Sequence, residues 1–176
     1  NDFEPTLTVQ RPWAYLIPAD LERVAEHLQL HGVEVLEVRE EMELDARAYR
    51  LDAVSRADRE FQGHRMLDVS EATAISMGVR AEPGWFLVRT EQTLGNLASY
   101  MLEPQATDGL AAWNFFDGHA EQGGVFPVYR LAAPTPILTR AARALPEDRP
   151  EPKRITADMI VHRRDYPRLN GPGSAD

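Results

Sequence analysis

Apolar residues recur at helical spacing in two stretches of the chain, and they alternate with polar residues in several others. The apolar run 14–17 predicts a strand, and Asp20 is placed to cap the helix that follows it. That helix should end at Gly32, because glycine readily adopts the backbone conformation of a helix C-terminus. A second strand follows, ending near Val38. We therefore expect a β-α-β unit over residues 14–39, with parallel strands and a right-handed crossover. Its apolar positions are Leu21, Val24, Ala25 and Leu28 on the helix, and Val33, Val35 and Val38 on the second strand.

Further strands and one more helix are expected downstream of this unit. Apolar residues from Leu94 to Leu102 recur at helical spacing, and Pro104 ends the helix that they define. The pattern predicts an α+β fold, in which the β-α-β unit is followed by mainly antiparallel strands and a second amphipathic helix, in a mixed sheet. The expected extended segments are 43–54, 62–69, 85–88, 113–116 and 126–131.

Proline divides the chain into two parts. We expect residues 1–133 to form the compact α+β body and residues 134–176 to be a Pro/Arg-rich tail or linker, with one short helix at 137–145. The tail cannot build a core of its own, because prolines interrupt its periodic segments. These prolines are Pro134, Pro136, Pro146, Pro150, Pro152, Pro167 and Pro172.

Composition and charge exclude several classes of function. The whole chain has a formal net charge of -9, and the excess of acidic residues lies within residues 1–133, so this acidic body would repel a phosphate backbone and we expect no nucleic-acid partner. No apolar run is long enough to span a bilayer as a helix, so no membrane partner is expected. The absence of cysteine excludes disulfides, thiolate metal sites and cysteine nucleophiles. Because the chain begins at Asn1, we expect a processed or excised segment.

Two histidines and a glutamate are the candidate metal ligands. His31 and Glu34 are three residues apart, the spacing at which zinc carboxypeptidases supply two ligands, and His119 or His162 could supply a third. His27 lies one helical turn before His31, but the sequence HLQLH lacks the glutamate that serves as base in zincins. The same histidines also fit a solvated helix edge, where an imidazolium meets the helix dipole favourably.

Aromatic residues form the candidate binding set. Trp85 and Trp113 could line a groove for peptide or glycan, with Glu103, Asp108 and Asn114 as polar partners. Aromatic residues on strands also commonly lie in the core, so both interpretations stay open. No Gly-x-Ser-x-Gly motif and no glycine-rich phosphate loop occurs in the sequence.

Several ordered motifs resemble a known family. The segments PGWFLVRTEQTLGNL (83–97), LEP (102–104), DG (108–109) and WNFF (113–116) occur in that order, with YLIP (15–18) and HGVEV (31–35) upstream and PVYR (127–130) closing the pattern. Residues 12–131 thereby resemble the domain that follows the catalytic domain in bacterial proteins of the zinc carboxypeptidase family.

The resemblance implies where the chemistry of such a protein lies. The family's zinc ligands and catalytic glutamate belong to the preceding domain, so the resemblance gives this chain no catalytic residue and no cofactor, and zinc is expected in the missing domain. It also implies a catalytic peptidase domain of the same polypeptide as partner, a peptide as substrate, and a periplasmic or extracellular location.

Three functions follow from these observations. The first is a non-catalytic accessory domain that packs against or orients the catalytic domain of a zinc carboxypeptidase-like peptidase. The second is an independent peptide- or glycan-binding module that uses Trp85 or Trp113. The third is an autonomous metal-dependent hydrolase that uses His27, His31 and Glu34.

Overall fold

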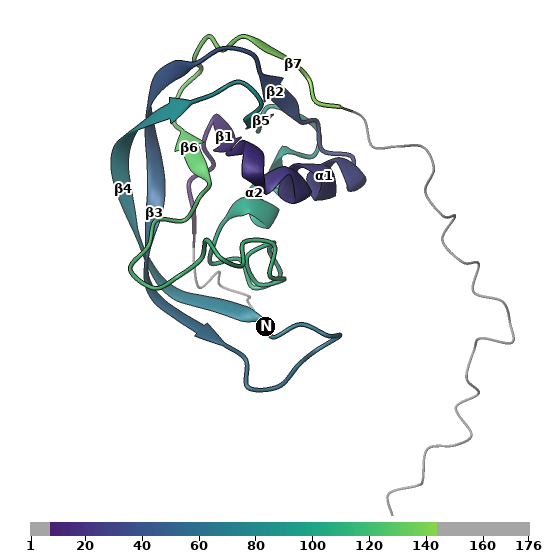
Figure 1. The fold of residues 1–176 in the computed structure, drawn as a ribbon, viewed down its shortest axis with the longest axis vertical. Helices are drawn as coiled ribbons and strands as arrows, with labels where there is room; N and C mark the ends of the chain where they lie inside the picture. The colour runs from purple at the N-terminus through teal and green to yellow at the C-terminus, as the bar shows by residue number, and fades with distance from the viewer. Residues whose placement is uncertain (1–7, 144–176) are drawn as a thin grey trace, which may run out of the picture. The chain divides into compact units, whose positions relative to one another are not determined.

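The structure, a computed structural model, describes residues 8–143, which contain one seven-stranded sheet and two α-helices (Figure 1). The strands lie in the order β4-β3-β6-β1-β5-β2-β7. In chain order the elements are β1 (Ala14–Ile17), a 3₁₀ turn (Ala19–Leu21), α1 (Glu22–Leu30), β2 (Leu36–Val38), β3 (Met42–Arg56), β4 (Leu67–Ala81), β5 (Phe86–Arg89), α2 (Gly95–Leu102), β6 (Tyr129–Leu131) and β7 (Thr139–Ala141). The α+β class expected from the sequence is confirmed.

The first strand-helix-strand segment is split by a later strand. β1 and β2 are both paired antiparallel with β5, which lies between them, so β1 and β2 run in the same direction without touching. Every strand pairing within residues 8–143 is consequently antiparallel, and the expectation of a mixed sheet is corrected. The sequence pattern could not reveal this, because β5 is inserted from far along the chain.

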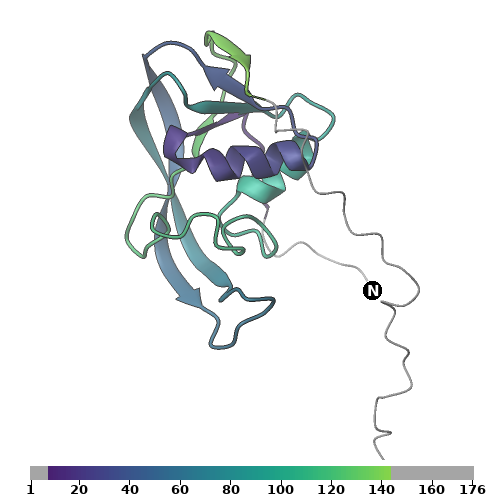
Figure 2. The ribbon, with the colours of Figure 1, turned by 45° about the vertical axis from the view of Figure 1, so that its right-hand side comes forward.

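Both faces of the central strands are buried. On β1, Tyr15 and Ile17 face a cluster that includes Val24 and Leu28 of α1 and Leu102 of α2. The two helices lie on this same face of the sheet (Figure 2). The opposite face, with Ala14 and Leu16, packs against Leu44 of β3 and Val79 of β4. Burial on both sides explains why β1 is an uninterrupted apolar run.

The long hairpin of β3 and β4 contributes to both clusters. Each strand has 15 residues, and together they curve around the central strands (Figure 1). Leu44 packs in one cluster and Leu51 in the other, because residues an odd number of positions apart on a strand point to opposite faces. The register is irregular only beyond Leu51, between Leu51 and Val54. The alternation expected over residues 43–54 is therefore present, but it changes face along the strand.

The helix α1 ends at the expected glycine, but Asp20 does not cap its start as the sequence predicted. Gly32 follows it with φ +83°, a left-handed conformation that glycine adopts without strain. Asp20 makes no capping hydrogen bond, because it lies within the preceding 3₁₀ turn, where its carboxylate is 3.7 Å from Nε2 of His119. Val33 and Val35 are buried but precede the strand, which starts only at Leu36.

Three other expectations are corrected. Residues 113–116 form turns rather than a strand, and Asn114 has φ +67° there. The strand expected at 62–69 starts at Leu67 and continues to Ala81. The sheet extends beyond Ala133, because β7 pairs with β2 at a position where a helix was expected. The remainder of the expected tail, residues 144–176, lies outside the described residues.

Within the part of the chain that the structure describes, neither helix has the length and apolar composition needed to cross a membrane.

Tight packing at the start of α2 leads to a first prediction. A Cβ added at Gly95 would lie 1.9 Å from the carbonyl oxygen of Thr90, so Gly95→Ala must displace the helix or the end of β5. We expect a loss of about 2–3 kcal/mol in the free energy of unfolding, measured by urea denaturation.

Gly78→Ala is the matched control, because a Cβ at Gly78 would meet no atom within 4 Å. It should change the free energy of unfolding by no more than about 0.5 kcal/mol. Equal losses in the two variants would show that the contact at Thr90 is not what requires glycine.

Candidate functional site

A buried ion pair ties α2 to the sheet. Glu103 follows the last residue of α2 and is 8 % exposed, and its Oε1 accepts a hydrogen bond of 2.6 Å from the hydroxyl of Tyr15 on β1. Nε of Arg130 on β6 lies 3.1 Å from the same oxygen, as an ion pair without hydrogen-bond alignment. The Arg130 guanidinium also donates to the hydroxyl of Tyr49 at 3.0 Å and to the carbonyl of Gln10.

Burial shifts the protonation of this cluster. Removal from water raises the pKa of Glu103, while the Tyr15 hydroxyl and the charge of Arg130 act in the opposite direction. The pKa of Tyr15 is raised by burial and then by the neighbouring Glu103 carboxylate. Because these groups join α2, β1 and β6, the arrangement is suited to holding structure, although Oε2 of Glu103 is buried without a hydrogen-bond partner among the described residues.

A second prediction tests this ion pair. Arg130→Met leaves the Glu103 carboxylate buried without its counter-charge, so we expect the free energy of unfolding to fall by about 3–5 kcal/mol in urea denaturation. Arg80→Met is the control, because Arg80 pairs with Glu41 at 2.6 Å and the two side chains are 60 % and 54 % exposed. An exposed pair of this kind contributes much less to stability than a buried one. Similar losses in both variants would contradict a special role for the buried pair.

A groove of about 920 Å³ lies between α1, α2 and the loop that follows α2. We call it the histidine groove. Its apolar lining includes Met101, Leu110 and Phe115, and Tyr100 stands at its edge. Its polar and charged lining residues are Arg23, His27, His31, His64, Asp108, Asn114 and Asp117, together with the indole of Trp113.

One side of α1 supplies a row of basic side chains. Arg23, His27 and His31 are four residues apart, which places them on the same side of the helix. The guanidinium of Arg23 lies 5.6 Å from the ring centre of Phe115, and the His27 ring lies 4.5 Å from it. Nδ1 of His31 is 3.0 Å from the carbonyl oxygen of His27. Because that oxygen only accepts, Nδ1 carries a proton and Nε2 stays available to a ligand.

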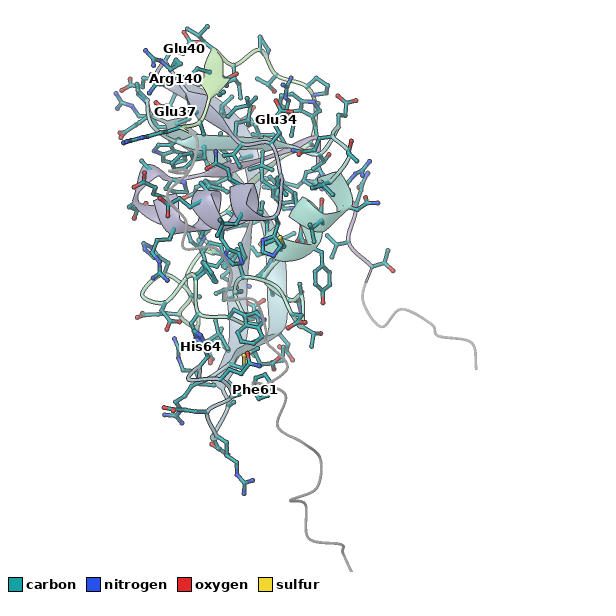
Figure 3. All side chains as sticks on the ribbon, turned by 90° about the vertical axis from the view of Figure 1, so that its right-hand side faces the viewer. Glu34, Glu37, Glu40, Phe61, His64 and Arg140 are labelled. Carbon is teal, nitrogen blue, oxygen red and sulfur yellow. The ribbon has the colours of Figure 1, made fainter. Side chains whose placement is uncertain are left out.

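The opposite wall consists of residues that local turns hold in place. Nε1 of Trp113 donates to Oδ1 of Asp108 at 2.9 Å. The side-chain amide of Asn114 donates to the carbonyl of Arg65 at 3.1 Å, which joins this loop to the β3–β4 connection. From that connection His64 lies edge-on to Trp113, with 5.6 Å between the ring centres. Phe61 and His64 lie together at this end of the hairpin (Figure 3).

The environment of His27 leads to a third prediction. Burial and the neighbouring His31 lower the pKa of His27 below the usual 6.5, so the folded chain binds this proton less readily than the unfolded chain. The stability that neutral His27 contributes is complete above about pH 6.5 and is lost as the pH falls towards the lower folded value. In His27→Gln, the free energy of unfolding should therefore fall less between about pH 8 and about pH 5 than it does in the native chain.

His119→Gln serves as the control for this measurement. His119 is exposed and lies beside Asp20, away from Phe115. The pH dependence attributed to His27 should persist in this variant, and its disappearance there would contradict the assignment.

The three candidate metal ligands do not come together. The His27 and His31 rings are neighbours, with 4.7 Å between their centres. Glu34 lies apart from them, with its carboxylate 4.0 Å from Arg89 and its backbone bound on both sides by the Gln92 amide. It lies at the same end of the sheet as Glu37, Glu40 and Arg140, far from His64 (Figure 3). Among residues 8–143, no group of three His, Asp or Glu side chains is arranged to hold a metal ion.

The candidate binding residues are divided among three places. Trp113, Asp108 and Asn114 lie in the histidine groove. Glu103 is instead buried in its ion pair, and Trp85 stacks on Tyr129 at 5.8 Å beside the core cluster on the other face of the sheet. Sequence reasoning missed Arg23 and His64 as groove residues. Arg23, His27 and His31 are four residues apart in the sequence, and this helical spacing was a signal that could have identified Arg23 as a groove residue.

Comparisons with known proteins identify a partial similarity. The chain is 30 % identical over 128 residues to carboxypeptidase 2 of Trichophyton rubrum, and 27 % and 26 % identical to the carboxypeptidase 2 of Trichophyton equinum and of Trichophyton tonsurans. The match covers 73 % of this chain but only 23 % of each relative. No protein-family model and no solved structure matches it. The chain therefore resembles a carboxypeptidase-associated region that forms a minor part of these fungal proteins.

Proposed function

We propose that the chain is a non-catalytic accessory domain of a zinc carboxypeptidase-like peptidase, which packs against or orients a catalytic domain of the same polypeptide. The observation that carries this proposal is the extent of the similarity. Most of this chain matches carboxypeptidase 2, yet the matched segment is less than a quarter of that protein. A domain of this size can be one module of a larger enzyme. In this proposal zinc and the reacting groups belong to the catalytic domain, and the whole protein acts outside the cytoplasm.

The roles of the chain's own charged residues support a structural contribution. The buried carboxylate of Glu103 is held by Tyr15 and Arg130 and so maintains the packing of α2. Ion pairs at the surface, such as the exposed pair of Arg80 with Glu41 and the pair of Arg140 with the partly buried Glu37, lie beside the strands. Such pairs are suited to a polar rim around a contact between domains.

Carboxypeptidase 2 of Trichophyton rubrum allows a direct test, which is the fourth prediction. Deletion of the matched 128-residue segment should leave a folded polypeptide that still cleaves a blocked dipeptide, but with faster thermal inactivation or a lower rate than the intact enzyme. The purified 176-residue chain, supplied with zinc, should cleave none of the same substrate.

Each arm can overturn a different part of the proposal. Turnover by the isolated chain, with about one zinc bound per molecule, would show that it is catalytic. A truncated relative that folds but has lost all hydrolysis would place catalytic residues within the segment. A truncated relative with unchanged rate and stability would remove the packing role.

The histidine groove favours a second function, that of a peptide- or glycan-binding module. Three residues expected to bind from the sequence, Trp113, Asp108 and Asn114, line this one groove. Its volume of about 920 Å³ falls within the usual range for ligand sites, and its apolar floor with a few fixed polar groups is typical of them. An accessory domain could hold a peptide through this groove while another domain cleaves it.

A further inference from the structure

Three arginines gather around one small hollow of this acidic chain. Arg11 precedes β1, Arg47 lies on β3 and Arg130 lies on β6, and all three line a hollow of about 70 Å³. We call it the arginine pocket. Its lining contains no acidic residue, although the chain as a whole has a formal net charge of -9. Guanidinium groups concentrated in this way form a setting for an anion.

Two of these arginines face each other across a strand pairing. β3 and β6 are neighbours in the sheet (Figure 1), and Arg47 is the direct partner of Arg130 in their antiparallel register. Side chains at such positions have Cβ atoms about 5 Å apart on one face of the sheet, and like charges there destabilise the pairing. An anion between them is attracted to both. The folded chain therefore contains an unfavourable contact that an anionic ligand relieves.

The neighbouring groups leave a positive charge at the pocket. Glu103 lies 3.1 Å from Nε of Arg130 and so balances that guanidinium. Arg11 donates to the amide oxygen of Asn96 at 2.6 Å, and this neutral partner leaves its charge in place. Neither Arg11 nor Arg47 forms an ion pair with another residue of the range 8–143. Two of the three guanidinium charges are thus uncompensated within that range.

Arg130 is held in position before any ligand arrives. Its guanidinium lies 5.2 Å from the ring centre of Tyr49 and donates to the Tyr49 hydroxyl at 3.0 Å and to the carbonyl of Gln10. A guanidinium fixed in this way loses little conformational freedom when it binds an anion. Arg11 and Arg47 are exposed residues, so the pocket is reached from solvent.

A second hollow adjoins the arginine pocket and shares Arg47 and Arg130 with it. It has a volume of about 230 Å³, and its lining adds the alkyl groups of Ala46 and Met77 and the carboxylate of Asp45. The alkyl groups favour an apolar part of a ligand, whereas Asp45 repels a second negative charge. A ligand with one carboxylate and an apolar group suits the two hollows better than a multiply charged anion.

We propose that the arginine pocket binds the carboxylate of a small monocarboxylic ligand, whose apolar group lies in the adjoining hollow beside Met77. The carboxylate can belong to an aliphatic acid or to the end of a peptide, because guanidinium groups bind either through paired, charge-assisted hydrogen bonds. This inference goes beyond the accessory role proposed above and does not depend on it, since the site lies within this chain. Binding should weaken as salt screens the exposed charges.

The test, our fifth prediction, uses the full 176-residue chain and isothermal titration calorimetry at low salt in a phosphate-free buffer. The probes are N-acetylleucine, which has a free carboxylate, and N-acetylleucine amide, which has the same shape without the charge. We expect the acid to bind at least about tenfold more tightly than the amide. Arg47→Gln should weaken binding of the acid by a similar factor.

Isocaproate distinguishes the two sources of the carboxylate, because it has the same branched apolar group without the amide. Equal affinity for isocaproate and N-acetylleucine supports an aliphatic acid as the ligand. Weaker binding of isocaproate supports the end of a peptide, whose amide then contributes to recognition.

Arg39→Gln is the matched control, because Arg39 is exposed and lines neither hollow. Its affinity for N-acetylleucine should stay within about twofold of the native value. Thermal denaturation without ligand supplies a second readout. Because Arg47→Gln removes one of two like charges that face each other, its melting temperature should equal or exceed that of the native chain. A lower melting temperature would contradict the repulsion from which the site is inferred.

Three further results would overturn the inference in distinguishable ways. Equal affinity for the acid and the amide, or no binding of either, would show that the guanidinium groups bind no carboxylate. Tighter binding of inorganic phosphate than of N-acetylleucine, in a separate titration, would make a phosphate group the occupant. An unchanged affinity of Arg47→Gln for N-acetylleucine would place the carboxylate site elsewhere in the chain.

Discussion

The buried carboxylate of Glu103 is the interaction on which the arrangement of this domain depends. It receives the hydroxyl of Tyr15 at 2.6 Å and the charge of Arg130 at 3.1 Å, so one side chain joins α2 to β1 and β6. A carboxylate removed from water is tolerated only where such partners are in place. The loop that carries Trp113 begins directly after Glu103, and the ion pair therefore also fixes where one wall of the histidine groove starts.

The groove itself is built by three parts of the chain that are distant in sequence. α1 supplies its basic row, the loop after α2 supplies Trp113 and Asn114, and the β3–β4 connection supplies His64. The hydrogen bond from Asn114 to the carbonyl of Arg65 joins the last two parts. Asn114 reaches that carbonyl from a left-handed backbone conformation, which asparagine tolerates better than most residues. The unusual backbone conformation of Asn114 thus belongs to a contact that forms the groove and not to the packing of the core.

The elements that the sequence predicted well were those with a continuous local signal. The apolar run of β1 and the helical spacing in α1 and α2 identify these elements without any knowledge of the partners. Residues 113–116 were mistaken for a strand because their aromatic content suits one, whereas Phe116 is buried by tertiary packing within a turn. The insertion of β5 between β1 and β2 leaves no trace in local periodicity, because it depends on pairing between distant segments.

The candidate site shows the same division between local and distant information. Sequence reasoning selected Glu103 as a polar binding partner because it lies near Trp113 in the sequence, yet its environment is decided by Tyr15 and Arg130. His27 and His31 were treated as possible metal ligands, and Trp113 with Asp108 as a separate binding set. The fold places both sets in one groove while directing Glu34 away from it. Histidines that would need a third acidic ligand for metal chemistry are instead combined with the aromatic side chains of Phe115 and Trp113.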